Sequence, residues 1–328
     1  MIIEAVKLYE MNVFAEFFLG ISIMYLIVHG LFLSLSSDKF PLIQSSIINL
    51  AVLCFFKYSP LVARSFFRNE DTIGQFLILL PLPIGISFFT FEGITLLVDT
   101  FKSKTAENKK KILIHKKPFA HLSNVAFFIS FFPHLISGPI LKAYEFFPQI
   151  TSKKIKEIQW EYAIKLLITG CFLKMVIADN LKEQTFGMAY PAFLNMPSST
   201  LVIQIFGYSM QIFSDFAGYS LIALGLASLF GYRLNQNFNY PYISTSFSEF
   251  WKRWHISLSS FLKEYLYFPL GGNKNGKLRT YFNLLTVMFL GGLWHGAAWS
   301  YAVWGSFHGL ALAVERLIKD CIVIRFNL

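Results

Sequence analysis

Long apolar runs separated by short polar gaps constrain the fold of this chain more than any other feature. A helix that crosses a lipid bilayer needs roughly 20 mostly apolar residues, so each run is a candidate membrane segment. Charged residues make up only 15% of the chain, against about 25% in an average soluble domain. The sequence therefore predicts a multi-pass protein of the cell membrane with candidate segments at 15–35, 45–63, 75–98, 119–140, 160–178, 201–230, 281–298 and 299–318.

The net charge of +10 comes mainly from basic residues in the gaps between the apolar runs. These positions favour contact with lipid headgroups, so we expect membrane lipid as a partner and no nucleic acid. The densest basic gap, from Lys102 to Lys117, is expected in the cytoplasm because positive loops stay on that side. Acidic Glu4, Glu10 and Glu16 replace a basic leader, so we expect the first run to be retained rather than cleaved.

The apolar runs lack the alternation of barrel strands, which favours an all-α fold, a polytopic bundle of transmembrane helices. Two runs are interrupted by helix-breaking residues, namely Pro81, Pro83 and Gly85 in one and Pro133, Gly138 and Pro139 in the other. Backbone groups freed at membrane depth need partners from protein or water. These breaks therefore indicate re-entrant elements around an internal chamber, and the alternative is a set of ordinary helices that end at proline.

The segment 244–273 is too polar for the lipid core and too aromatic for a simple loop. Ser246 followed by Glu249 fits a capping box, which predicts the start of an interfacial helix. Because His255 lies four residues after Trp251, the two side chains are expected on one helical face. The imidazole of His255 is then either a proton acceptor or donor-site contact, or a simple hydrogen-bond partner of a lipid phosphate.

Residues 289–310 contain no Asp, Glu, Lys or Arg but hold two histidines. His295 lies between Gly292 and Gly296, and an ionisable group inside a membrane segment is a functional candidate by default. Small neighbours allow close approach of another helix, and a neutral imidazole suits the abstraction of a hydroxyl proton. The structural alternative is a histidine that bridges two helices.

Other polar residues in the apolar runs have weaker claims to a functional role. His308 and His134 are interpreted as packing or hydrogen-bonding residues, and the same caution applies to His29, His115 and His121. A stripe of polar side chains at helical spacing must face protein or water, and Asp215 within it is expected to anchor a helix; its members are Tyr208, Gln211, Asp215 and Tyr219. No P-loop, GxSxG or HExxH pattern occurs, and the three cysteines form neither a metal pattern nor a disulfide framework.

Two neighbouring stretches carry a family resemblance. SFSEFWKRWHISLSSFLKEYLYFPLGGNKNGKLRTYFNLL and FLGGLWHGAAWSYAVWGSFHGL closely resemble the membrane-bound O-acyltransferase family, within it the alginate and peptidoglycan O-acetyltransferase branch. Supporting stretches are PLPIGISFFTFEGITLLVDTF, FFPHLISGPI and QIFSDFAGYSLIALGLASLFGYRLNQNFNYPY. The resemblance divides the chain into an N-terminal membrane segment without a clear match (1–46), an acyltransferase-like membrane domain (47–316) and a short tail (317–328).

The resemblance implies acyl transfer to a hydroxyl inside a tunnel through the bilayer. His295 in the LWHG motif would be the essential catalytic residue, and His255 in WKRWH would match the second histidine of the family. The implied donor is cytoplasmic acetyl-CoA, used as a substrate, with no bound cofactor or metal. The implied acceptor is a cell-surface polysaccharide, reached through an extracytoplasmic, esterase-like partner protein.

Several residues depart from the pattern of the branch. Leu221 replaces an Asp, Lys263 and Glu264 replace Arg-Asp, and Phe282 replaces an Arg. These departures bear on the substrate more than on the chemistry. The chain also ends where relatives continue into further helices, so one alternative is a truncated, inactive family member. A second alternative, from a different class, is a proton-coupled transporter or channel with relaying histidines.

Overall fold

The computed structural model describes residues 39–68, 71–83, 85–104, 117–135, 137–188 and 191–326. The described part is helical and contains no β-strand, which confirms the all-α prediction for these residues. Short 3₁₀ and π-helical turns connect or extend the main helices. The α-helices are α2 (Lys39–Phe66), α3 (Thr72–Leu79), α4 (Ile86–Lys104), α5 (Pro118–Ser130), α6 (Ala143–Phe146), α7 (Trp160–Cys171), α8 (Asp179–Thr185), α9 (Ser198–Leu229), α10 (Phe247–Arg253), α11 (Ile256–Leu262), α12 (Lys277–His295) and α13 (Trp299–Phe326).

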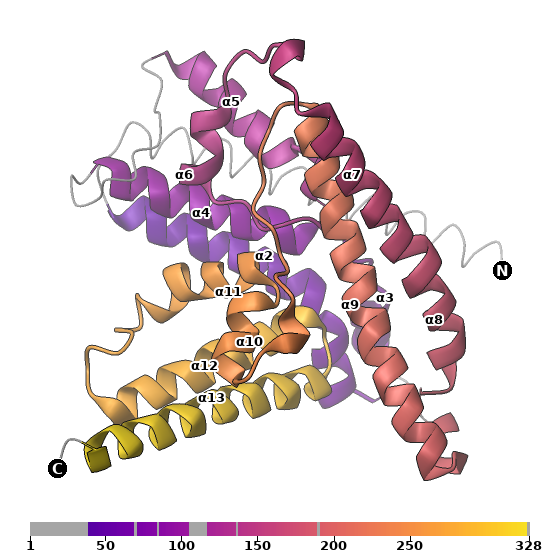
Figure 1. Ribbon diagram of the computed structural model, residues 1–328. Coiled ribbons are helices and arrows are strands. Elements are labelled where there is room, and N and C mark those ends of the chain that lie inside the picture. Colours follow the sequence, from indigo (N-terminus) through magenta and orange to yellow (C-terminus); the bar gives the residue numbers. More distant parts are fainter. Residues whose placement is uncertain are drawn as a thin grey trace.

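The longer helices pack mainly in three groups, visible in Figure 1. α2 lies along α4, α7 and α8 lie along α9, and α12 forms a hairpin with α13. The short helices α10 and α11 lie in the middle of the molecule, between the α2–α4 pair and the α12–α13 hairpin. The segment 244–273, which carries His255, is therefore central to the described part of the chain.

Both predicted helix breaks occur where the sequence places them. Pro81 and Pro83 separate α3 from α4, and Gly85 in this break has a positive φ of 77°. α5 ends at Ser130, and a 3₁₀ turn containing Pro133 follows it. Proline supplies no amide donor and its ring opposes a preceding helical turn, so each apolar run is divided into shorter elements.

The main hydrophobic core joins α4 to the segment from α5 to α6. Leu96 and Leu97 of α4 are fully buried, as is Phe128 of α5, and Phe146 of α6 is 1% exposed. The core also encloses a pair of ionisable side chains, because His134 Nε2 contacts Glu92 Oε1 and both side chains have no exposure. Burial of a charge is costly without a partner, so each of these groups accounts for the burial of the other.

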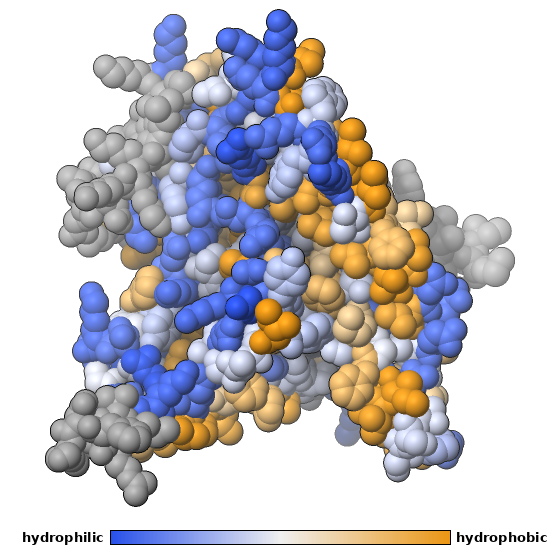
Figure 2. All heavy atoms as spheres, in the orientation of Figure 1, coloured by the Kyte–Doolittle hydropathy of each residue, from blue (hydrophilic) through white to orange (hydrophobic). Residues whose placement is uncertain are grey.

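Two described helices are long and apolar enough to cross a membrane by length and composition, Leu42–Phe66 within α2 and Ser198–Leu229, which is α9. The N-terminal run 15–35 lies outside the described residues. Figure 2 shows apolar side chains gathered over the outer flank formed by α7, the turn that follows it and α9. Large exposed apolar side chains contribute to this flank, among them Ile164, Ile168, Phe172, Met175, Ile203 and Phe206. An exposed apolar face of this kind suits contact with lipid.

The polar stripe of α9 faces the neighbouring α7–α8 unit. Asp215 Oδ1 forms an ion pair with Lys174 Nζ at 2.6 Å, and Lys174 also lies 5.2 Å from the ring centroid of Tyr219. Gln211 accepts a hydrogen bond from Thr185 at 2.7 Å. These contacts confirm the prediction that Asp215 anchors a helix.

Candidate active site

The α12–α13 hairpin brings the LWHG motif to a tight turn. α12 ends at His295, and α13 begins at Trp299. The two backbones touch at Gly292 and Gly305, where a methyl group on Gly305 would overlap the Met288 carbonyl oxygen and lie 2.9 Å from Gly292 Cα. The predicted use of Gly292 for close approach is confirmed, because only glycine fits at this contact.

His295 is exposed at the end of this hairpin and has an aromatic environment. Its ring centroid lies 5.1 Å from that of Trp294 and 5.4 Å from that of Trp304. The His255 ring is 6.2 Å away. The described residues thus leave the imidazole of His295 open to a reactant while aromatic rings surround part of it.

His255 does not lie on a helix, so its predicted position on a helical face with Trp251 is wrong. α10 begins as predicted, with Ser246 Oγ accepting a hydrogen bond from the Glu249 amide at 3.1 Å, but it ends at Arg253. His255 has φ 43° and ψ 54°, in the left-handed region, and separates α10 from α11. The reversal buries the ring to 1% exposure against Phe216, with centroids 4.6 Å apart.

Hydrogen bonds from two amides to a distant residue explain why the helix breaks here. The Ile256 amide donates to the Asn237 carbonyl at 2.9 Å, and the Ser257 amide donates to Asn237 Oδ1 at 3.3 Å. Asn237 itself is 1% exposed and donates to Ser220 at 3.0 Å. These bonds satisfy amides that a continuous helix would have paired internally.

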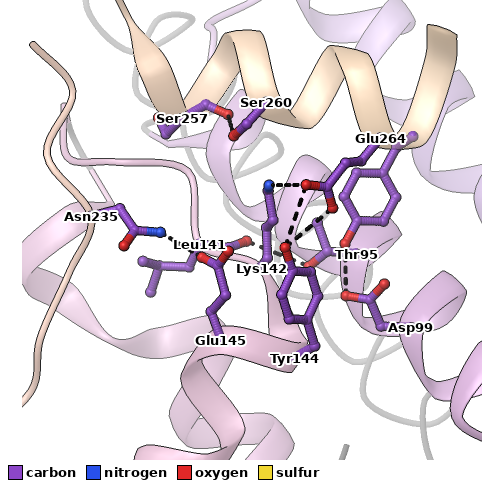
Figure 3. Close-up of polar contacts among 11 residues, drawn as sticks. Thr95, Asp99, Leu141, Lys142, Tyr144, Glu145, Asn235, Ser257, Ser260 and Glu264 are labelled. Carbon is purple, nitrogen blue, oxygen red and sulfur yellow. Dashed lines mark hydrogen bonds and ion pairs between the residues drawn. The ribbon is translucent and has the colours of Figure 1, made fainter. Parts of the chain in front are cut away.

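The loop between α5 and α6 holds α11 at both ends, and Figure 3 shows the contact beyond its C-terminal end. The Ile140 amide donates to Ser257 Oγ at 3.0 Å near the start of α11. Beyond its end, Glu264 forms an ion pair with Lys142 at 2.9 Å and accepts a hydrogen bond from Tyr144 at 3.2 Å. Two ties from one loop therefore fix the helix that follows His255.

A second acidic residue lies beside this ion pair. The Tyr265 hydroxyl donates to Asp99 Oδ2 of α4 at 2.7 Å. Burial, together with the Asp99 carboxylate, raises the pKa of Tyr265 far above its usual range. The phenol therefore stays protonated and keeps its role as donor, which links α4 to the turn after α11.

A cavity of about 120 Å³ lies beside His295. Its lining comes from α10, α11, α12 and α13 and is mostly apolar, with Ser259 and His295 as polar members; the other lining residues are Trp251, Leu258, Leu262, Val287, Met288, Gly291 and Trp304. Four buried nitrogens in this region have no hydrogen-bond partner among the described residues, namely Trp251 Nε1, Trp294 Nε1, His255 Nδ1 and His255 Nε2. Because buried polar atoms are normally paired, these nitrogens are candidates to bind a reactant.

The remaining histidines lie apart from this cavity or pack against aromatic rings. His308 is surrounded by aromatic side chains, with Trp304 at 4.8 Å and Trp251 at 5.2 Å between ring centroids. The Trp304 ring contacts both the His295 and the His308 rings. His134 pairs with Glu92, and buried His121 lies 6.3 Å from the Phe147 ring. His29 and His115 lie outside the described residues.

Lys57 and Tyr58 of α2 contact the turn that carries His295, and the sequence-based interpretation did not select them. Lys57 Nζ donates to the Trp294 carbonyl oxygen, and the Tyr58 hydroxyl donates to the Leu293 carbonyl oxygen at 3.0 Å. The isolated lysine within the apolar run 45–63 was the feature that could have identified this contact, because a charge in a membrane segment needs a partner.

The described residues contain no group of three or more His, Cys, Asp or Glu side chains that could hold a metal ion. Cys54, Cys171 and Cys321 are free. The lining of the cavity offers imidazole, hydroxyl and indole groups in an apolar wall.

Comparison with known proteins places these features in a family. The model of the membrane-bound O-acyltransferase family matches residues 21–325. The chain belongs to this family. It is 37% identical over 284 residues to the probable alginate O-acetylase AlgI of Pseudomonas aeruginosa, covering 84% of this chain and 51% of that protein.

The names of two further relatives specify other acceptors or another acyl group. The peptidoglycan O-acetyltransferase of Helicobacter pylori is 39% identical over 292 residues, 84% of this chain and 55% of that protein. The teichoic acid D-alanyltransferase of Bacillus subtilis is 32% identical over 252 residues, 72% of this chain and 59% of that protein. The chain spans about half the length of the curated relatives it matches.

Proposed function

We propose that this protein transfers an acetyl group, or another short acyl group, to a hydroxyl group at the cell surface. The observation that carries the proposal is the exposed imidazole of His295, which lies beside a cavity of about 120 Å³. This cavity is small. It suits a short acyl group better than a fatty acyl chain.

His295 acts in this proposal as the general base. Its neutral imidazole takes the proton of the acceptor hydroxyl as the hydroxyl oxygen attacks the acyl carbonyl carbon of acetyl-CoA. A new carbon–oxygen bond forms, the carbon–sulfur bond breaks, and the departing thiolate takes the proton from the imidazolium. A variant of the same proposal has His295 carry the acyl group transiently.

The aromatic and apolar lining supports this chemistry because it limits the access of water. An acyl donor in a wet site is lost to hydrolysis, whereas a water-poor wall preserves it for the acceptor. Buried His255, 6.2 Å away between ring centroids, assists by orienting a reactant through its unpartnered ring nitrogens. A passage through the bilayer would bring the cytoplasmic donor and the external acceptor to this point.

The partners of the proposed reaction lie on both sides of the membrane. The donor is acetyl-CoA from the cytoplasm, and the acetyl group moves to a cell-surface polysaccharide by way of an extracytoplasmic partner protein. The names of the alginate and peptidoglycan relatives support this acceptor class. The protein itself is multi-pass in the cell membrane, with the basic gap from Lys102 to Lys117 in the cytoplasm.

Labelled acetyl-CoA and membranes that contain the full-length protein test the proposal. We expect His295→Ala to lower acyl incorporation by a factor of about 100 to 10,000, the usual contribution of a general base, while the protein still accumulates in the membrane. His308→Ala is the matched control and should retain most activity, since His308 does not line the cavity beside His295. Full activity of His295→Ala, or proton flux in proteoliposomes without acyl transfer, would refute the proposal.

A further inference from the structure

Lys57 places a charged group within the apolar stretch of α2. It belongs to the stretch Leu42–Phe66, which is long and apolar enough to cross a membrane. Its neighbours Phe56 and Ser59 are 2% and 4% exposed. A charge at such a position is costly and is retained where it has a specific partner.

The partners of Lys57 converge on the last turn of α12. The ammonium group donates to the Trp294 carbonyl oxygen and lies 5.0 Å from the centroid of the Trp294 ring. It also donates to Ser87 Oγ at 2.9 Å, which ties it to α4. The contact with Trp294 joins residues 237 positions apart in the chain.

Two other side chains of α2 contact the same region. The Tyr58 hydroxyl donates to the Leu293 carbonyl oxygen at 3.0 Å. Ser65 Oγ accepts a hydrogen bond at 3.1 Å from the indole of Trp299, the first residue of α13. α2 therefore holds the α12–α13 turn at three residues, which are Leu293 and Trp294 before His295 and Trp299 after it.

Helix physics explains why carbonyl groups at this place need outside donors. The last four carbonyl groups of an α-helix have no amide partner within the helix. A cation near that end also offsets the negative end of the helix dipole. Because α12 ends at His295, Lys57 and Tyr58 supply donors to the turn that carries the imidazole.

The Trp294 side chain is fixed as well. Its ring stacks on Phe91 at 5.7 Å and meets Phe88 edge-on at 6.1 Å, both from α4. Contacts with α2 and α4 thus hold both the backbone and the ring of Trp294. In the next residue, His295, only the side-chain torsions lie between this fixed backbone and the imidazole. The direction of the imidazole follows from the position of that backbone.

We propose that Lys57 is a positioning residue for the acyl transfer: its ammonium group caps the end of α12 and so aims His295 at the cavity and at His255. The inference rests on the proposed function of His295. Lys57 acts through the Trp294 carbonyl and touches neither donor nor acceptor. Tyr58 makes a smaller contribution of the same kind through its single hydrogen bond.

The test compares Lys57→Met, Lys57→Arg and Tyr58→Phe in the labelled acetyl-CoA assay with full-length protein in membranes. A small displacement of a catalytic group costs up to about 100-fold in rate. We expect Lys57→Met to lower kcat by roughly 10- to 100-fold with KM for acetyl-CoA within about twofold, because donor binding is untouched. Lys57→Arg keeps a cationic donor and should recover most of kcat.

Lys165→Met is the matched control. Lys165 lies on α7 with 72% side-chain exposure and pairs only locally with Glu161, so we expect unchanged kinetics. A kcat within twofold of wild type for Lys57→Met, or an arginine variant no better than methionine, would overturn the inference. If Lys57→Met fails to accumulate in the membrane, Tyr58→Phe decides, with a loss of about two- to fivefold in kcat expected and an unchanged kcat overturning the inference.

Chemical modification gives a readout that does not depend on turnover. Diethyl pyrocarbonate acylates accessible imidazoles, and peptide mass spectrometry reports the rate at His295. We expect this rate to change at least about threefold in Lys57→Met and to stay constant in Lys165→Met, because only the first variant releases the His295 turn. An unchanged rate in both would overturn the inference.

Parallel measurement of His295→Ala separates the two proposals. If His295→Ala is inactive while Lys57→Met behaves as wild type, only the positioning role fails. If His295→Ala is fully active, the proposed function fails first.

Discussion

The ring centroids of His255 and His295 lie 6.2 Å apart, yet the two residues are held in different ways. His255 is 1% exposed and sits in a left-handed turn whose amides bond to a distant segment. His295 is exposed at the end of a helix, and its turn is held through main-chain carbonyl groups by side chains of α2. Packing around the ring holds His255, whereas hydrogen bonds to the backbone of its turn hold His295.

This difference separates two kinds of contribution to a site. A buried ring gains packing energy, and its removal leaves a cavity. A ring left open gains little from packing and remains available to a reactant. The comparison therefore predicts that the two histidines respond differently to truncation.

The largest expected effect comes from truncating both histidines in turn. His295→Ala should remove about 100-fold or more of the acyl transfer rate and should lower stability less than His255→Ala does, since His295 is the more exposed of the two residues. His255→Ala should cost about 2–4 kcal/mol of stability, because it deletes a buried ring. Transfer assays and thermal unfolding in detergent check both, and equal stability losses would end the distinction.

A substitution in the hairpin tests how far the His295 region depends on its backbone. Gly305→Ala introduces a methyl group against the Met288 carbonyl oxygen and Gly292 Cα. We expect a loss of about 1–3 kcal/mol and at least a tenfold fall in transfer, because the helices must separate at the turn before His295. The control is Gly207→Ala in α9, where the nearest atom is a Thr185 methyl at 3.3 Å, and a gain in helix propensity offsets the contact. Equal behaviour of the two variants would contradict the prediction.

An intermediate effect is expected on the His255 side. Glu264→Gln removes the charge that pairs with Lys142, whose side chain is only 5% exposed. Breaking a fully buried pair costs about 3–5 kcal/mol, but Glu264 is 28% exposed, so we expect about 1–2 kcal/mol after allowance for solvent screening. Transfer should fall only a few-fold, because α11 is still held by Ser257. Glu161→Gln, which breaks an exposed pair, is the control, and its loss of stability should be near zero.

The smallest effect concerns the start of α10, which leads to His255. Hydrogen bonds from the Thr245 amide and hydroxyl, together with Arg253, hold the pKa of Glu249 below its usual range. A lowered carboxyl pKa contributes stability above the usual carboxyl range, and that stability is lost as pH falls through the folded-state pKa. Thermal unfolding from about pH 7 to about pH 3 should therefore show a slightly smaller acid destabilisation for Glu249→Gln than for wild type. Identical pH profiles would show that the cap contributes nothing.

The sequence alone predicted much of the local architecture of this protein. The apolar runs gave the helices α2, α9, α12 and α13, and proline and glycine marked the breaks around α3–α4 and after α5, because these residues act on their own backbone. Ser246 marked the start of α10 for the same local reason. The choice of His295 and His255 as site residues stays a prediction for the transfer assays.

Tertiary structure alone decided how these elements meet. The helical period predicted His255 on one face with Trp251. Hydrogen bonds from the Ile256 and Ser257 amides to Asn237 instead accompany a left-handed conformation at His255 that no local pattern encodes. The contacts of Lys57 with Trp294 and of Lys142 with Glu264 join residues 237 and 122 positions apart. Local preferences fix which residues become helical, whereas contacts between distant residues depend on how whole helices pack, and so the surroundings of both histidines emerged only from the folded chain.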